Sequence, residues 1–174
     1  RETGGKNMKL CPFCKTPPPR SNEDEVKRLK KLMEKGNACA FLRFSGLYYN
    51  GTCGMPQDMA KTNDLYLKAG ELGCATAYYN LGTQYFSGRG VEVDKKKAKH
   101  YYELAAMNGS VIARHNLGAL EGNAGNHHRA MKHFIISARA GHKLSLNNIK
   151  NGYMHGDVTK DQYANTLREY QNSQ

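Results

Sequence analysis

The sequence predicts an all-α protein in which antiparallel helix pairs stack side by side into an α-solenoid. Three observations lead to this prediction. Small and tyrosyl residues return at intervals of 36 and then 32 residues. Within each interval, the apolar residues follow the three-to-four-residue spacing of a helix. The composition, with 18 glycines, 5 prolines and no tryptophan, suits short helices that end at glycine.

The repetition is clearest at Asn80-Leu81-Gly82, which returns 36 residues later as Asn116-Leu117-Gly118. Gly46 precedes Gly82 by the same interval, so we expect it to be the equivalent glycine of the first unit. The third unit is four residues shorter. The missing residues fall between Glu121 and Asn126, which reads as a turn, where a deletion is tolerated.

Each unit reads as two helices. The apolar stripe of the first helix consists of Ala75, Tyr78, Leu81, Gly82 and Tyr85, and that of the second of Ala98, Tyr101, Tyr102, Ala105 and Ala106. Asp94 is a typical N-cap for the second helix, and Gly109 follows it where a left-handed residue is common. Such a unit buries its stripe only against a neighbouring unit, so the units must stack.

Amphipathic helices are predicted at both ends of the array, at about 23–35 and 160–171. The first has Ser21 as its cap and Asp24 as a capping-box partner. The predicted organisation is a linker and zinc-finger remnant at 1–20, an N-terminal capping helix at 21–37, the repeat array at 38–156 and a C-terminal capping helix at 157–174.

The recurring residues resemble the Sel-1-like repeat (SLR) family, which is related to the tetratricopeptide repeat. The stretch from Ala77 to Gly109, AYYNLGTQYFSGRGVEVDKKKAKHYYELAAMNG, is similar to a nearly complete SLR unit, and segments 38–73 and 110–141 match it more loosely. The resemblance implies a right-handed superhelix and a role as a protein–protein interaction scaffold or adaptor, often in ubiquitin-linked quality control or signalling.

Cys11-Pro12-Phe13-Cys14 is a pair of thiols at zinc-ligand spacing. With the prolines that follow, it resembles the last ligand pair of a RING-type zinc finger, which implies a longer parent chain that recruits a ubiquitin-conjugating enzyme. Cys11 and Cys14 would hold zinc only with ligands upstream of Arg1. The alternatives are a stray thiol pair or an isolated disulfide. We predict no catalytic site and no cofactor in this fragment, and a RING-type ubiquitin ligase remains the alternative for the parent.

Asparagine recurs at one position of each unit, at Asn80, Asn116 and Asn148, with Arg43 at the equivalent place in the first unit. In related tetratricopeptide arrays this position faces a peptide-binding groove. The predicted groove residues are Arg43, Tyr79, Asn80, His115, Asn116, Asn147 and Asn148. Two interpretations stay open: the amides grip a partner's backbone, or they bond the neighbouring helix and stiffen the stack. Thr76, Ile112 and Leu144 stand where lysines would favour a C-terminal carboxylate.

Charge and cysteine content narrow the class of protein. The net charge of +11 comes largely from lysine runs at 27–31 and 95–99, which fit solvated helix faces first, an acidic protein partner second and nucleic acid last. No apolar run reaches membrane-spanning length. Five cysteines without a secretory signature favour an intracellular, cytoplasmic or nuclear setting. His127, His128 and His133 lack a carboxylate or thiol at ligand spacing and read as a solvated turn.

Overall fold

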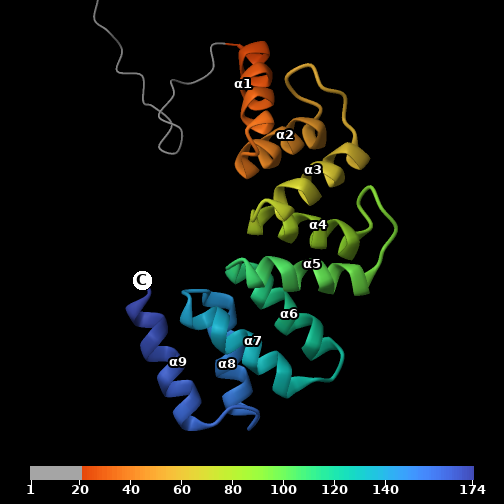
Figure 1. Ribbon diagram of the computed structural model, residues 1–174. Helices are drawn as coiled ribbons and strands as arrows, with labels where there is room; N and C mark the ends of the chain where they lie inside the picture. The colour runs from red at the N-terminus through yellow and green to blue at the C-terminus, as the bar shows by residue number, and fades with distance from the viewer. Residues whose placement is uncertain (1–20) are drawn as a thin grey trace, which may run out of the picture.

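The computed structural model describes residues 21–174, which form nine α-helices and no strand (Figure 1). This confirms the all-α prediction. The helices are α1 (Asn22–Glu34), α2 (Ala38–Asn50), α3 (Met59–Glu71), α4 (Ala75–Ser87), α5 (Lys95–Met107), α6 (Val111–Asn123), α7 (His127–Arg139), α8 (Lys143–Met154) and α9 (Lys160–Asn172).

Helices α2 and α3, α4 and α5, and α6 and α7 form three antiparallel hairpins that follow one another along the molecule, with α8 and α9 after them (Figure 1). Each helix packs mainly on the helices next to it in sequence, and α9 also packs on α7. The translational order of the hairpins is that of a solenoid. None of the helices in residues 21–174 combines the length and apolar character that crossing a bilayer requires.

The helix ends follow from local chemistry. Ser21 and Asp94 accept hydrogen bonds from the first turns of α1 and α5, as predicted. Gly109 follows α5 with a φ of +89°, a left-handed conformation that a residue with a Cβ adopts only with strain. Only Ala124–Asn126 separate α6 from α7, whereas Gly88–Asp94 separate α4 from α5. The four-residue deletion therefore lies in the turn between α6 and α7.

The core is built from small residues and aromatic rings. Ala77, Ala98 and Ala105 are fully buried, and the ring of Tyr102 is 3% exposed. Because alanine lets two helix backbones approach closely, one tyrosine fills the space that remains between them. Most of the predicted stripe is buried, with Tyr85 and Tyr101 stacked at its margin, 5.5 Å between ring centroids. On α4 the prediction missed Ala77 and Gln84, which are buried as well.

The predicted equivalence of Gly46 and Gly82 is wrong. Helices α2 and α4 begin 37 residues apart, because the loop after α2 is one residue longer than the loop after α4. The residue of α2 that matches Gly82 is therefore Ser45, which is fully buried. A Cβ added at Gly46 would meet no atom within 4 Å. The same one-residue shift aligns Arg43 with Asn80, as predicted.

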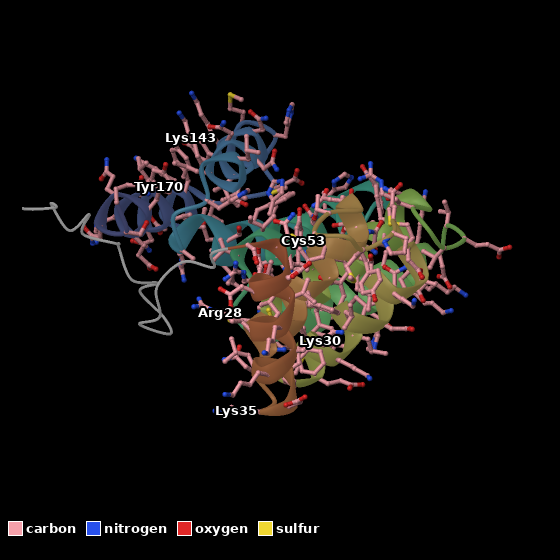
Figure 2. All side chains as sticks on the ribbon, turned by 90° about the horizontal axis from the view of Figure 1, so that it is seen from above. Arg28, Lys30, Lys35, Cys53, Lys143 and Tyr170 are labelled. Atoms are coloured by element: carbon pink, nitrogen blue, oxygen red, sulfur yellow. The ribbon has the colours of Figure 1, made fainter. Side chains whose placement is uncertain are left out.

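A terminal helix covers each end of the array. At the first end, Leu29 of α1 is buried against α2, while Lys30 and Lys35 project outward (Figure 2). At the other end, Thr166 of α9 is buried and Tyr163 stacks on Tyr153 of α8, 5.3 Å between ring centroids. Both terminal helices thus cover the array with one face and keep the other in solvent.

Candidate functional site

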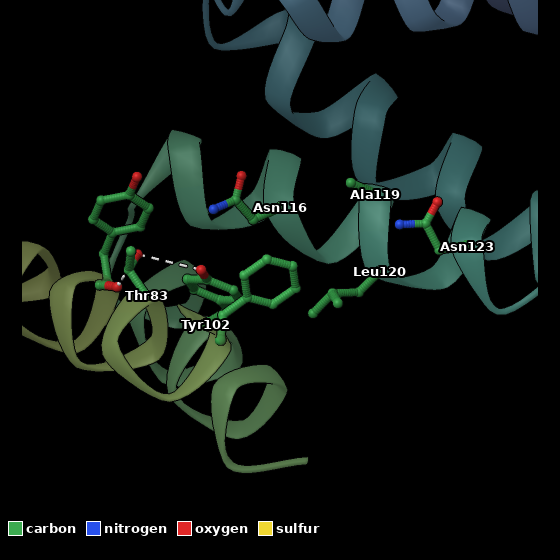
Figure 3. Close-up of a pocket in the computed structure, with 8 residues that line it drawn as sticks. Thr83, Tyr102, Asn116, Ala119, Leu120 and Asn123 are labelled. Atoms are coloured by element: carbon green, nitrogen blue, oxygen red, sulfur yellow. Dashed lines mark hydrogen bonds between the residues drawn. The ribbon is translucent and has the colours of Figure 1, made fainter. Parts of the chain in front are cut away.

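A pocket of about 240 Å³ opens between α4 and α6, the first helices of two successive hairpins. Tyr102 of α5 contributes to its lining, and Phe86 beside it is 44% exposed. Figure 3 shows Asn116, Ala119, Leu120 and Asn123 along α6, opposite Thr83. The remaining lining residue is Tyr79.

We call the side of α4, α6 and α8 that carries the pocket residues and their repeat equivalents the first-helix face. It consists of Tyr79, Asn80, Thr83, Phe86, His115, Asn116, Ala119, Leu120, Asn123, Asn147 and Asn148.

The hydroxyl of Tyr102 is held at the edge of this pocket. The Thr83 hydroxyl lies 3.3 Å from it (Figure 3). Burial raises the pKa of the Tyr102 phenol, while hydrogen bonding from the Thr83 and Asn116 side chains opposes that rise. The Asn116 side chain of α6 therefore stabilises the ionised form of a phenol that belongs to the preceding hairpin.

The same arrangement occurs one hairpin earlier. Tyr66 of α3 is buried, and burial raises the pKa of its phenol, while hydrogen bonding from Ser45 and Asn80 opposes that rise. One hairpin later, the equivalent ring is that of Phe134, which has no hydroxyl for Asn148 to bond. Two of the three recurring asparagines thus lower the pKa of a tyrosine on the neighbouring helix, and the third has no such phenol beside it.

Apart from His115 and the half-buried Asn80, the predicted groove residues divide into three groups. Tyr79 and Asn116 line the pocket directly. Asn147 is exposed and Asn148 half-buried on α8, further along the array. Arg43 instead forms an ion pair with Glu25 of α1, 2.7 Å from guanidinium nitrogen to carboxylate oxygen, and so links the terminal helix to the first hairpin.

His115 is part of a polar joint between α6 and α8. Its Nδ1 lies 2.8 Å from the Ser145 hydroxyl, and its ring centroid lies 4.6 Å from that of His142. Nδ1 of His142 accepts the Ser145 backbone N–H and thereby caps α8. Burial lowers the pKa of His115, and the neighbouring His142 lowers it further. Burial also lowers the pKa of His142.

Sequence reasoning missed the buried ion pair of Glu121 and Lys99. Glu121 is 4% exposed, and one carboxylate oxygen lies 2.6 Å from Nζ of Lys99. Asn126 donates to its other oxygen at 2.8 Å. The Lys99 hydrogen bond holds the pKa of the Glu121 carboxyl below its usual value despite burial. The pair joins α5 to α6 and to the start of α7.

The histidines that were considered as metal ligands and three of the cysteines lie in the described residues, whereas Cys11 and Cys14 do not. Residues 21–174 contain no group of three or more His, Cys, Asp or Glu side chains placed to hold a metal ion. His127 and His128 are exposed in the first turn of α7 rather than in a turn between helices, and His133 is half-buried. Cys39, Cys53 and Cys74 are free thiols. Cys11 and Cys14 lie outside the described residues, so the zinc prediction stays a prediction.

The repeat pattern matches a known family. The Sel1 repeat model matches residues 44–74, 75–110 and 111–142, together more than half of the chain. The chain belongs to the Sel1 repeat family. The three matched Sel1 repeats correspond to the three hairpins, the first starting within α2. The third Sel1 repeat ends just before α8, so α8 and α9 lie outside the matched segments.

Two curated proteins are similar in sequence. The ERAD-associated E3 ubiquitin-protein ligase component HRD3B of Arabidopsis thaliana is 36% identical over 105 residues, 58% of this chain and 16% of that protein. The putative sel1-like repeat-containing protein L21 of Acanthamoeba polyphaga mimivirus is 38% identical over 66 residues, 38% of this chain and 12% of that protein. The chain spans less than a fifth of the length of these relatives.

Two solved structures share the solenoid fold. A Sel1 repeat protein from Oxalobacter formigenes superposes with a TM-score of 0.72 at 23% identity, over 88% of this chain and 65% of that one. The protective antigen c5321 of uropathogenic Escherichia coli, which displays an SLR fold, gives a TM-score of 0.71 at 29% identity, over 85% and 32%. These likenesses confirm the predicted solenoid.

Proposed function

We propose that this Sel1 repeat array is a scaffold or adaptor that binds another protein through its first-helix face, with α1 and α9 covering the ends of the array. The observation that carries the proposal is the pocket between α4 and α6, which is lined by exposed Phe86, half-buried Leu120 and the amides of Asn116 and Asn123. Apolar surface beside hydrogen-bonding groups is typical of a protein-binding site.

A charge placed on this face tests the proposal. The variants are Phe86→Asp in the pocket and Met107→Asp at the end of α5, where the side chain is 79% exposed. Proteins are captured from a lysate of the cells that make this chain and are quantified by mass spectrometry. We expect a set of proteins that wild type and Met107→Asp retain and Phe86→Asp loses. Equal capture by all three folded proteins would contradict the proposal.

A narrower role, in substrate selection for a RING-type ubiquitin ligase, is supported by two separate observations. The first is the Cys11–Cys14 spacing. The second is the 36% identity over 105 residues to a protein described as an E3 ubiquitin-protein ligase component. On this proposal the chain's parent also binds zinc and a ubiquitin-conjugating enzyme in the cytoplasm or nucleus.

The sequence encoded upstream of Arg1 tests this narrower role. A RING finger that ends at Cys11 and Cys14 requires further Cys and His pairs before them, since each tetrahedral zinc takes four ligands. We expect the longer protein to contain zinc and to accelerate ubiquitin transfer from a charged conjugating enzyme. An upstream sequence without such pairs would exclude the ligase role and leave the scaffold proposal intact.

A further inference from the structure

We infer that the first-helix face takes an extended, uncharged, internal segment of its partner and holds one large apolar side chain of that segment in the pocket between α4 and α6. The inference rests on the proposed function, because it names the class of ligand for the same face. Four features carry it: the distribution of charge, the residues that precede the recurring asparagines, the amides beside the pocket, and the size and lining of the pocket.

Charge is nearly absent from the two helices that form the pocket. Helix α4 has no charged side chain, whereas α5 has five, in a chain of net charge +11. The charged residues of α6 are Arg114, which donates to the Ala106 carbonyl, and Glu121, which is buried. A charged ligand group here would lose its hydration without gaining an opposite charge, so an uncharged segment fits this face best.

The face also lacks a cation that could hold a chain terminus. One turn before the recurring asparagines stand Thr76, Ile112 and Leu144. Ile112 is 49% exposed and Leu144 is 60% exposed. A C-terminal carboxylate binds most strongly to arginine, lysine or clustered N–H donors, none of which these side chains supply. Ile112 and Leu144 add apolar surface instead, which suits the interior of a partner's chain.

The amides of Asn116 and Asn123 set the conformation of the ligand. The two residues are seven apart on α6, so they share one face of that helix, and both line the pocket (Figure 3). Each amide offers both donors and an acceptor. A helix or hairpin has already paired its own backbone groups, whereas an extended segment presents free N–H and C=O groups that the amides can bond.

The pocket has the dimensions of a site for one side chain. Its volume of about 240 Å³ lies below the roughly 300–1,000 Å³ of sites that enclose whole small molecules. Tyr79, Phe86 and Leu120 form apolar walls, and the ring of Tyr102 adds a further apolar surface. Leucine, methionine or phenylalanine would be buried there with little loss of hydrogen bonding.

Nucleic acid fits the same surface poorly. Its binding depends on lysine and arginine contacts to phosphates, and the first-helix face contains neither residue. The lysines at 95–97 lie on α5 and belong to the second helices of the hairpins. We therefore expect the first-helix face to bind a polypeptide segment and not nucleic acid.

A random-peptide phage library, selected on the whole chain and counter-selected on the Phe86→Asp variant, tests the inference. We expect enriched peptides with net charge near zero and one fixed leucine, methionine or aromatic position. Replacing that position by alanine should weaken binding at least about tenfold. Blocking both peptide ends should leave affinity unchanged within about twofold, as should raising the salt concentration from about 50 to 500 mM.

Two kinds of failure are distinguishable, with circular dichroism confirming that each variant is folded. Peptides that require Phe86 but are highly charged, need a free carboxylate or lose affinity steeply with salt would overturn the inference and leave the proposed function standing. If no enriched peptide binds the wild type and fails to bind the Phe86→Asp variant, both the inference and the proposed function are contradicted. Met107→Asp serves as the matched control and should bind every selected peptide normally.

Discussion

The ring of Tyr102 lies directly against the backbone of Gly82, so closely that a Cβ atom at position 82 would come within 2.7 Å of the Tyr102 Cδ1 atom. The next hairpin repeats the relationship: a Cβ on Gly118 would lie 2.7 Å from a carbon of the Phe134 ring. Gly82 and Gly118 therefore admit an aromatic ring between the two helices of the second and the third hairpin.

Adding one methyl group at these glycines should destabilise the array. We expect Gly82→Ala and Gly118→Ala each to lower the free energy of unfolding by about 1–3 kcal/mol, because the ring beside each glycine is enclosed. Gly46→Ala is the matched control. It lies inside α2 with open space around it, so it should be neutral or stabilise by up to about 1 kcal/mol. Urea unfolding measures all three, and equal losses would show that the register is wrong.

The Tyr102 hydroxyl should couple two hairpins. Tyr102→Phe removes a hydroxyl that bonds the Thr83 hydroxyl and whose pKa the Asn116 amide lowers, so we expect a loss of about 1 kcal/mol. In a double-mutant cycle, Tyr102→Phe and Asn116→Ala should show an interaction free energy of about 0.5 kcal/mol or more. The free-energy losses of Tyr102→Phe and Asn148→Ala should be additive, because the Tyr102 phenol lies beside Asn116 and not beside Asn148. If the free-energy losses of Tyr102→Phe and Asn116→Ala are additive, Asn116 does not stiffen the stack through Tyr102.

The Glu121–Lys99 pair should respond unequally to the loss of either partner. The side chain of Glu121 is 5% exposed and that of Lys99 is 41% exposed. Lys99→Ala leaves a buried carboxylate uncompensated and should cost about 2 kcal/mol or more. Glu121→Gln leaves a lysine that turns into water and should cost less. Chemical denaturation of both variants tests this, and the reverse order would mean that Glu121 is more hydrated than its position implies.

Acid should destabilise the α6–α8 joint. Folding lowers the pKa of His115, His133 and His142, so the unfolded chain binds protons more readily. Their contribution to stability is complete above about pH 6.5 and is lost as the pH falls toward the lower folded values.

The variant His142→Asn tests the acid response, because asparagine still caps α8 but does not titrate. We expect its melting temperature to fall less than that of the wild type between about pH 7.5 and pH 5. His128→Asn, at an exposed position, should melt like the wild type at both values. An unchanged acid response in His142→Asn would exclude this joint as the sensitive site.

The helices and their buried sides could be predicted because period and cap are local properties. Asp94 and Gly109 mark their helix ends through their own chemistry, and the alanine and tyrosine stripe of α5 follows from helical spacing. The alignment of Gly46 failed because two glycines happen to fall 36 residues apart, whereas the one-residue insertion that aligns Arg43 with Asn80 moves the true equivalent to Ser45.

The candidate site was only partly predictable, because its decisive contacts join residues from different helices. Tyr79 and Asn116 were found from their repeat positions. Phe86, Leu120 and the ion pair of Lys99 with Glu121 were not, since nothing local distinguishes a buried carboxylate or an exposed ring. The pairing of Ser145 with two histidines likewise requires the distance between α6 and α8.

The central claim is that partners bind the first-helix face, and nuclear magnetic resonance with a selected peptide tests it most directly. Amide resonances of the labelled chain are followed during titration with that peptide. We expect the amide resonances of Tyr79, Phe86, Asn116 and Asn123 to shift most. The resonances of Met107 and of the exposed lysines of α5 should not shift. Shifts centred on α5, or on the outer side of α1 or α9, would contradict it.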